Sequence, residues 1–428
     1  MTGPRTVLVF QNRFLLGGQE RQTMLHLRTL DRSRWEPLVA CFRAEGEHMA
    51  DLREMGVRVD EVPVRSLGTP RTAWLVKQLS DRIRRERIAL VHSQDFFTDV
   101  VGTLAARLAG VPSIVTRVDL AHALDPVRYQ LLRGVSHLAT RVLVNALCIR
   151  DLCLRDGVDP SKMVVLRNGL DLAAFDAAAE AAPAPGAPDF GRLTVINVAN
   201  MHHPVKGQPD LLAAMRLVLR EFPQAQLALV GDGVRRPLLE AQARRLGIED
   251  RVLFLGHRAD VPALVARAAV AVSSSYSEGI SNAVLEAMAA RCAVVATAVG
   301  GTPEIVHDGV TGWLAPPGAP AALAARIGAA LRDPITARRA GQAARGLVAR
   351  EFAVEEMREA YDALYGGLAD AKAAPPSRWV VPGPRRTEGA APAAPPAEGD
   401  SASPRQEKTP GPTGPGAERM EAGDGAQA

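Results

Sequence analysis

Aromatic residues and cysteines are scarce in this chain. Only 4% of the residues are aromatic while 47% are hydrophobic, so the cores must be mainly aliphatic. The four cysteines, Cys41, Cys148, Cys153 and Cys292, form neither a C-x-x-C pair nor a disulfide framework, which favours packing roles in a reducing compartment. No apolar run approaches the roughly 18 residues that span a bilayer, and the opening MTGPRTVLVF is too short for a secretion signal. The sequence therefore predicts a cytoplasmic protein.

Length and charge narrow the class further. A chain of 428 residues is too long for one ordinary domain, which favours two domains with a crevice between them. The formal net charge of +4 is small for this length and by itself neither supports nor excludes nucleic-acid binding. We expect no nucleic-acid partner, and composition alone names no other.

Short β-branched runs alternate with segments of helical periodicity. The runs in the first half are TVLVF, EPLVACF, VRVDEVPV, IALVHSQ, PSIVTRV, RVLVNA and MVVLRNG, and those in the second are LTVINVAN, AQLALVGDG, RVLFLGH, VAVSSS and AVVATAV. Helices are expected between them, for example over 18–31 and 72–85. This alternation is typical of βαβ units around a parallel sheet, and its restart predicts two doubly wound α/β domains.

Composition also suggests the domain boundaries. An Ala/Pro-rich stretch over 177–189 is interpreted as a linker between a Rossmann-like domain over 1–176 and a second one over 190–372. The last helix of the second domain is expected to pack back on the first. From 373 to 428 the chain is rich in Pro, Ala and Gly, a composition that predicts a disordered tail.

Three glycine-containing loops follow predicted strands and precede predicted helices. Gly17-Gly18 and Gly231 would let a ligand approach the backbone, although a plain turn explains each equally well. Lys206-Gly207 places an ammonium at a helix start, where the helix dipole prefers anions. A phosphate between the lysine and the helix would resolve that conflict, and a solvated loop lysine is the alternative.

Two glutamates lie in the stretch SEGISNAVLEAMAA. Glu278 falls in a loop after a strand, and Ser281 and Asn282 are good residues for the start of the helix that carries Glu286. Because the neighbours of Glu286 are mostly apolar, its carboxylate is expected to be buried and to need a partner, such as sugar hydroxyls. We expect the two carboxylates to flank one phosphate-sized site. A solvated helix residue is the alternative for Glu286.

The residues around these loops resemble a known family. Glu278, seven intervening residues and Glu286 resemble the E-x7-E signature of retaining glycosyltransferases of family 4, which have the GT-B fold. The segments VANMHHPVKGQPDLL, LVGDGVRRPLLEAQARRLGIEDRVLFLGH and VGGTPEIVHDGVTGWLAPPG match as well, and VHSQDFFTDVVGTLAARLAGVP and VVLRNGLDLAAF are similar to the acceptor-side domain. The resemblance covers roughly residues 6–368.

The resemblance implies a role for each matching residue. Lys206 would neutralise the diphosphate of a nucleotide sugar, Glu286 would bind its ribose, and Gly17 and Gly18 would close over the diphosphate from the other domain. Glu278, with the backbone of Gly279, Ile280, Ser281 and Asn282, would hold the transferred sugar. Glu278 and Lys206 are the predicted catalytic residues, and Gly231 joins the donor-binding set.

The expected activity is metal-independent, hexosyltransferase-type sugar transfer with retention. The donor would be a nucleoside diphosphate sugar and the acceptor a glycan or a lipid-linked sugar, as in cell-surface polysaccharide or glycolipid synthesis. We expect no cofactor, because the sequence shows neither a D-x-D element in a suitable loop nor a histidine pair at metal-ligand spacing.

Two departures from the family pattern leave residues open. Relatives carry an arginine near the lysine loop, where this chain has Met201, His202 and His203; we expect a histidine, for example His203, to substitute for it. Relatives also have a histidine after the strand in SIVTRVDLAHALDP. His122 is the candidate for that place, with Arg117 and Asp119 as alternatives.

Two other functions stay open: a nucleotide-sugar epimerase of the same fold, and a binding protein that has lost catalysis. Peripheral contact with the inner face of the membrane is a further hypothesis, because RTAWLVKQLSDRIRRERIAL combines Trp74, Leu75 and Leu79 with several arginines. An ordinary helix whose arginines face water is the alternative.

Overall fold

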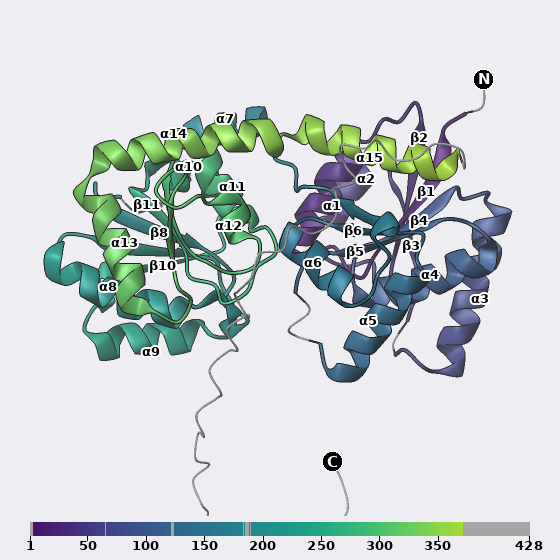
Figure 1. Cartoon of the computed structure of the whole chain (residues 1–428), viewed down its shortest axis with the longest axis horizontal. Coiled ribbons are helices and arrows are strands. Elements are labelled where there is room, and N and C mark those ends of the chain that lie inside the picture. The colour runs from purple at the N-terminus through teal and green to yellow at the C-terminus, as the bar shows by residue number, and fades with distance from the viewer. Residues whose placement is uncertain are drawn as a thin grey trace, which may run out of the picture. The chain divides into compact units, whose positions relative to one another are not determined.

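The computed structural model describes residues 3–64, 66–120, 124–182, 184, 188 and 190–370. Within them lie two parallel β-sheets, each with helices on both faces (Figure 1). This confirms the predicted doubly wound α/β fold. The predicted tail over 373–428 lies outside the described residues.

The first sheet has the strand order β3-β2-β1-β4-β5-β6-β7 and the second the order β10-β9-β8-β11-β12-β13. The strands of the first sheet are β1 (Arg5–Gln11), β2 (Trp35–Cys41), β3 (Arg58–Glu61), β4 (Leu90–Ser93), β5 (Ser113–Arg117), β6 (Arg141–Val144) and β7 (Met163–Val165). Those of the second are β8 (Thr194–Val198), β9 (Gln226–Val230), β10 (Val252–Gly256), β11 (Val270–Ser273), β12 (Ala293–Thr297) and β13 (Trp313–Ala315). All the predicted runs form strands, whereas β13 was not predicted from the sequence.

The helices alternate with the strands as far as β13, and the last helices follow one another without a strand between them. They are α1 (Gly18–Thr29), α2 (Met49–Glu54), α3 (Pro70–Arg85), α4 (Phe96–Ala109), α5 (Pro126–Leu138), α6 (Leu147–Arg155), α7 (Leu172–Glu180), α8 (Gln208–Glu221), α9 (Arg236–Leu246), α10 (Val261–Arg267), α11 (Asn282–Ala289), α12 (Thr302–Ile305), α13 (Pro320–Arg332), α14 (Pro334–Glu351) and α15 (Val354–Ala369). In the described part of the chain, the short 3₁₀ turns Pro160–Lys162, Pro204–Lys206 and Glu249–Arg251 precede β7, α8 and β10. No described helix is both long and apolar enough to cross a membrane.

The cores follow from the pleat of the buried strands. Successive side chains of a strand point to opposite faces, and in β1 Val7 and Val9 join one hydrophobic cluster while Leu8 and Phe10 join another. Helices α3 and α4 cover the Leu8 side, and α1 covers the Val7 side. Both faces are buried, as expected for a parallel sheet.

The last helix belongs by contact to the first sheet. Val354, Met357, Leu364 and Tyr365 of α15 share the cluster on the Val7 side of β1, and α15 runs beside α1 (Figure 1). Tyr365 is fully buried, and its hydroxyl lies 2.9 Å from Nε2 of His26 and 2.7 Å from Nδ1 of His92. Burial lowers the pKa of both histidines, so they are neutral hydrogen-bonding groups of this contact.

The chain between the two sheets differs from the expected linker. Helix α7 continues to Glu180, so the first four residues of the predicted linker are helical. Ala184 donates its backbone N–H to Asp260 at 2.8 Å. Alanine is the best helix former, and the AAAE run therefore extends the helix to Glu180.

Candidate functional site

A large cavity lies at the carboxyl ends of the strands of both sheets. It encloses about 770 Å³. Strand order reverses between β1 and β4 and between β8 and β11, and ligands bind where neighbouring connections diverge in this way. The site-forming loops predicted from the sequence follow β1, β8, β9 and β11, and each contributes to the lining.

Glu278 and Lys206 form an ion pair in this cavity. Nζ of Lys206 lies 2.7 Å from Oε1 of Glu278, which also accepts a hydrogen bond of 2.6 Å from the hydroxyl of Ser275. The side chains are 24% and 12% exposed, respectively, so both are largely desolvated yet reach the cavity. The sequence predicted both residues for the site but not their direct contact.

The backbone around Lys206 is tightly constrained. Gly207, between the 3₁₀ turn and α8, has a φ of +62°, and a Cβ there would lie 1.9 Å from the carbonyl oxygen of Ser274. The hydroxyl of Ser274 donates to the carbonyl of Lys206 at 2.9 Å. Only glycine fits this left-handed, crowded position, which fixes the lysine at the cavity wall.

The double glycine that follows β12 supports Glu278 from behind. Gly300 has a φ of +50°, and an added Cβ would lie 1.8 Å from the carbonyl oxygen of Glu278. Gly301 donates its N–H to the same oxygen at 3.3 Å. Gly300 and Gly301 are not among the described residues that line the cavity, so their role is close backbone packing.

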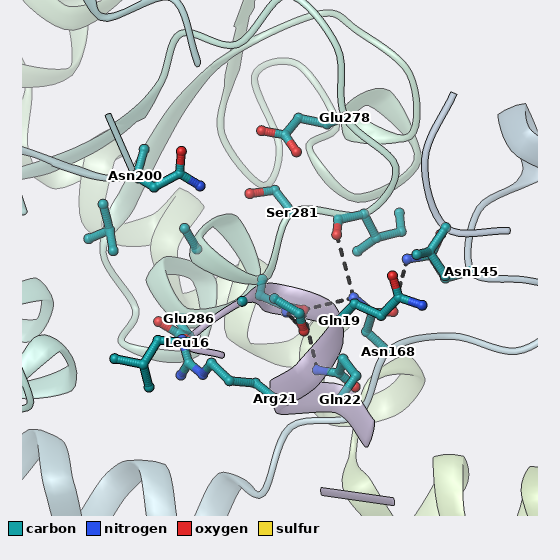
Figure 2. A pocket seen from close by; sticks show the side chains of 18 of the residues that line it. Leu16, Gln19, Arg21, Gln22, Asn145, Asn168, Asn200, Glu278, Ser281 and Glu286 are labelled. Atoms are coloured by element: carbon teal, nitrogen blue, oxygen red, sulfur yellow. Dashed lines mark hydrogen bonds and ion pairs between the residues drawn. The ribbon is translucent and has the colours of Figure 1, made fainter. Parts of the chain in front are cut away.

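Glu286 lies on α11 and is buried, as expected. Its partner is a residue that the sequence analysis missed: Nη2 of Arg21, in the first turn of α1, lies 2.6 Å from Oε1 of Glu286. The Arg21 side chain is 53% exposed and that of Glu286 only 6%. Figure 2 shows the two side chains together, apart from Glu278 and Ser281. The sequence predicted that the two carboxylates flank one phosphate-sized site. In the structure each carboxylate instead pairs with its own cation, and both pairs lie in one cavity.

Burial raises the pKa of the Glu286 carboxyl, and the Arg21 guanidinium opposes part of that rise. Between the usual pKa of 4.5 and the raised one, the folded state binds more protons than the unfolded state, so this group makes the free energy of unfolding fall as pH increases. Glu286→Gln removes this contribution. We expect the stability of the variant relative to wild type to improve as pH rises from about 4 to about 7.

Urea titrations of both proteins at the two pH values measure this difference. Glu351→Gln, at an exposed position at the end of α14, is the matched control and should show no such trend. An unchanged difference between Glu286→Gln and wild type would mean that Arg21 fully compensates the burial of the carboxylate.

A cluster of side-chain amides joins the glycine loop to α11. Nδ2 of Asn282 donates to the carbonyl of Gly18 at 2.9 Å, and Oδ1 of Asn282 accepts from Asn168 at 2.7 Å and from Gln22 at 3.3 Å. Nδ2 of Asn145 in turn donates to Oδ1 of Asn168 at 3.0 Å (Figure 2). Asn282 is thus a hydrogen-bonding junction, and Gln22 and Asn145 are site residues that the sequence analysis missed.

Of the remaining predicted glycines, Gly231 and Gly279 allow close approach of backbone segments. Gly17 is the N-cap of α1, and a Cβ on Gly18 would lie 3.2 Å from Nδ2 of Asn282. Gly231 has a φ of +126°, and an added Cβ would lie 2.1 Å from the carbonyl oxygen of Ala199. A Cβ on Gly279 would lie 2.2 Å from the carbonyl oxygen of Val118. Ile280 and Ser281, which follow Gly279, line the cavity.

The candidates for the open positions do not come together in the cavity. Arg117 is buried and pairs with Asp156 at 3.1 Å, outside the lining, whereas its neighbours Thr116 and Val118 line the cavity. The reason is the alternation of side chains along β5, which the sequence analysis did not resolve. His203 is exposed and is not among the described lining residues. His122 lies outside the described residues.

Cations other than the predicted histidines line the cavity. Arg258 makes two hydrogen bonds to Asp260, of 2.8 and 2.6 Å, and Arg167 lies 2.7 Å from Glu304. Arg258 follows β10 and Arg167 follows β7. Their places at or just after the ends of predicted strands are the signal by which the sequence could have identified them. No group of three or more His, Cys, Asp or Glu among the described residues is arranged to hold a metal ion.

Two family models match the chain. The model described as Glycosyltransferase Family 4 matches residues 16–174, and the model described as Glycosyl transferases group 1 matches residues 192–333. Together they span more than half of the chain.

The chain belongs to the glycosyltransferases of group 1 and family 4. Alpha-maltose-1-phosphate synthase of Mycolicibacterium smegmatis is 29% identical over 367 residues, with 72% of this chain and 91% of that protein covered. The UDP-Gal:alpha-D-GlcNAc-diphosphoundecaprenol alpha-1,3-galactosyltransferase of Escherichia coli is 24% identical over 322 residues, with coverages of 70% and 81%.

Solved structures show that this glycosyltransferase has the GT-B fold. Anabaena Alr3699/HepE, in complex with UDP and glucose, matches with a TM-score of 0.73 and 22% identity, covering 85% of this chain and 99% of that one. Sucrose-phosphate synthase from Thermosynechococcus elongatus matches with a TM-score of 0.72 and 22% identity, covering 86% and 100%.

Proposed function

We propose that this glycosyltransferase moves a hexose from a nucleoside diphosphate sugar to a glycan or lipid-linked acceptor, with retention of anomeric configuration and without a metal ion. The observation that carries the proposal is the Lys206–Glu278 pair in a cavity at the carboxyl ends of the strands. The structures of Alr3699/HepE, whose ligands are UDP and glucose, support this class of donor.

The pair suits the charges that develop during transfer. Breaking the bond between the anomeric carbon and the phosphate oxygen leaves negative charge on the diphosphate and positive charge on the sugar. Lys206 would stabilise the first and the carboxylate of Glu278 the second. Both groups reach the same cavity, so a donor bound there would have its leaving oxygen and its anomeric carbon within reach of them.

The acceptor and the pathway rest on the relatives. The Escherichia coli relative acts, by its name, on a sugar carried by diphosphoundecaprenol, and the Mycolicibacterium smegmatis relative makes a maltose phosphate. We therefore include both lipid-linked and free glycan acceptors, in cell-surface polysaccharide or glycolipid synthesis in the cytoplasm.

Peripheral membrane contact is a further part of the proposal. Leu75 and Leu79 are buried in the first domain, and of the three apolar residues considered on α3 Trp74 alone is exposed, at 55%. Arg82 is engaged by Asp60 and Glu86. Trp74 and the exposed basic residues Arg71, Arg84 and Arg85 would have to carry the contact, which sedimentation with anionic vesicles tests.

A panel of UDP-, GDP- and ADP-sugars tests the main proposal. The purified protein should release one nucleoside diphosphate slowly, equally with and without EDTA, and faster when a suitable glycan or lipid-linked acceptor is added. NMR of the product should show the anomeric configuration of the donor.

Other results would replace the proposal. A new sugar isomer formed without any acceptor would indicate an epimerase. Tight binding of a donor without turnover, with all acceptors tried, would indicate a binding protein. If EDTA stopped release of the nucleoside diphosphate and Mg²⁺ or Mn²⁺ restored it, the enzyme would need a metal ion. The rest of the proposal would stand.

A further inference from the structure

Each of the two glutamates of the cavity, Glu278 and Glu286, is paired with a cation in this structure. Lys206 contacts Glu278, and Arg21 contacts Glu286. A nucleoside diphosphate sugar brings two negative charges, and its departing diphosphate carries still more. Lys206 alone, already shared with a carboxylate, leaves part of this charge without a partner.

Among the described residues that line the cavity are three arginines, which differ in how firmly they are held. Arg258 makes two hydrogen bonds to Asp260 and its side chain is 15% exposed. Arg167 contacts Glu304, and its side chain is 20% exposed. Arg21 makes one contact, to Glu286, and is 53% exposed. Arg21 is therefore the arginine that can change partners at the lowest cost.

Its place on the fold points to an anion as the second partner. Arg21 stands in the first turn of α1, beside Gly17 and Gly18, at the end of the helix that favours anions. Its own N–H is bonded to the carbonyl of Gly17 at 3.1 Å, and the carboxylate of Glu20 lies against Gly17. The guanidinium and the positive end of the helix dipole act in the same direction. Gly18 lies against Asn282, the first residue of α11, so Arg21 reaches the α11 side of the cavity.

Glu286 can accept a replacement for Arg21. A buried carboxylate must keep hydrogen-bond donors, and two ribose hydroxyls provide them without charge. Oε1 of Glu286 is the atom that Arg21 contacts, so a ribose that binds this oxygen competes directly with the guanidinium.

We propose that Arg21 exchanges partners on donor binding: the nucleotide's ribose takes its place on Glu286, and the released guanidinium binds the diphosphate as the second cation beside Lys206. This inference rests on the proposed function, because it presupposes a nucleoside diphosphate donor. It assigns Arg21 two tasks, holding Glu286 before the donor binds and neutralising the phosphate afterwards.

Dissociation constants of the diphosphate and of its nucleoside test the exchange. Each diphosphate (UDP, GDP or ADP) is compared with its own nucleoside (uridine, guanosine or adenosine). Binding is measured by ligand-detected NMR titration. We expect Arg21→Gln to weaken diphosphate binding roughly 10- to 100-fold, since it loses a charge-assisted contact. Nucleoside binding should not weaken, because the neutral amide of the variant no longer competes for Glu286 as a cation. Arg21→Lys should recover part of the diphosphate affinity.

Arg28→Gln is the matched control. Arg28 lies on the same helix, is 52% exposed, pairs with Asp51 at 2.7 Å and is not among the described residues that line the cavity. The Arg28→Gln variant should bind the diphosphate and the nucleoside with the affinities of the wild type. Glu286→Gln should show the reverse of Arg21→Gln, with weaker nucleoside binding and a larger ratio of diphosphate to nucleoside affinity.

The possible outcomes distinguish failure of the partner exchange from failure of the proposed function. If wild type binds none of the diphosphates, the proposed function fails and the exchange fails with it. If wild type binds one and Arg21→Gln leaves the affinity ratio unchanged, the exchange alone is overturned. If Arg21→Gln bound the diphosphate and the nucleoside more weakly by the same factor, Arg21 would only hold Glu286 in position and would not bind the diphosphate.

Discussion

Glu278→Gln should reduce sugar transfer by roughly 100- to 1,000-fold while the protein stays folded, because the site loses the charge that stabilises a positive anomeric centre. Glutamine has nearly the same shape and keeps an oxygen that can accept from Ser275 and Lys206, so the local structure should persist. The comparison is between steady-state rates with saturating donor and acceptor.

Two further measurements make this result specific. The affinity for the nucleoside diphosphate should change far less than the rate, because the carboxylate acts mainly in the transition state. Glu351→Gln, at the exposed end of α14, should transfer sugar at the wild-type rate. If Glu278→Gln kept its activity within about twofold, the stabilising group would have to be another residue of the cavity.

Lys206→Met should be comparably damaging, but through the diphosphate. One unit charge about 4 Å away is worth about 4 kcal/mol at an effective dielectric of 20, which corresponds to a loss of about 1,000-fold in kcat/KM. The substitution also leaves Glu278 without its cation in a setting where it is only 12% exposed. Unlike Glu278→Gln, it should weaken binding of the free nucleoside diphosphate.

Lys77→Met provides the control for loss of a lysine charge. Lys77 pairs with Asp81 on the exposed surface of α3, and its removal should leave kcat/KM unchanged. Lys206→Arg should recover part of the activity, because it restores the charge on a longer side chain. Full diphosphate affinity in Lys206→Met would contradict the role given to Lys206.

The positions of the site loops could be predicted from local pattern. Glu278 follows the apolar run VAVSSS and Lys206 follows LTVINVAN, and both runs form the expected strands β11 and β8. Parallel strands place their carboxyl ends on one edge, so residues that follow different strands meet there. The burial of Glu286 was likewise readable from its apolar neighbours on α11.

Side-chain direction was harder to predict. Arg117 and Val118 are adjacent, yet only Val118 lines the cavity, and a one-residue uncertainty in the register of a strand reverses this result. His203 also follows a strand, but the chain turns so that Met201 is buried and His203 is exposed. Proximity in sequence to a site loop therefore did not identify the second cation.

By itself, the sequence determined the two parallel sheets, their order along the chain and the loops that carry Lys206, Glu278 and Glu286, because hydrophobic periodicity and helix starts are local properties. The partners of these residues were decided only by the tertiary structure. Arg21 and Glu286 are 265 positions apart, and nothing local to either one specifies the contact. Lys206 and Glu278, 72 positions apart, meet because β8 and β11 are neighbours in the sheet, which the strand order alone establishes.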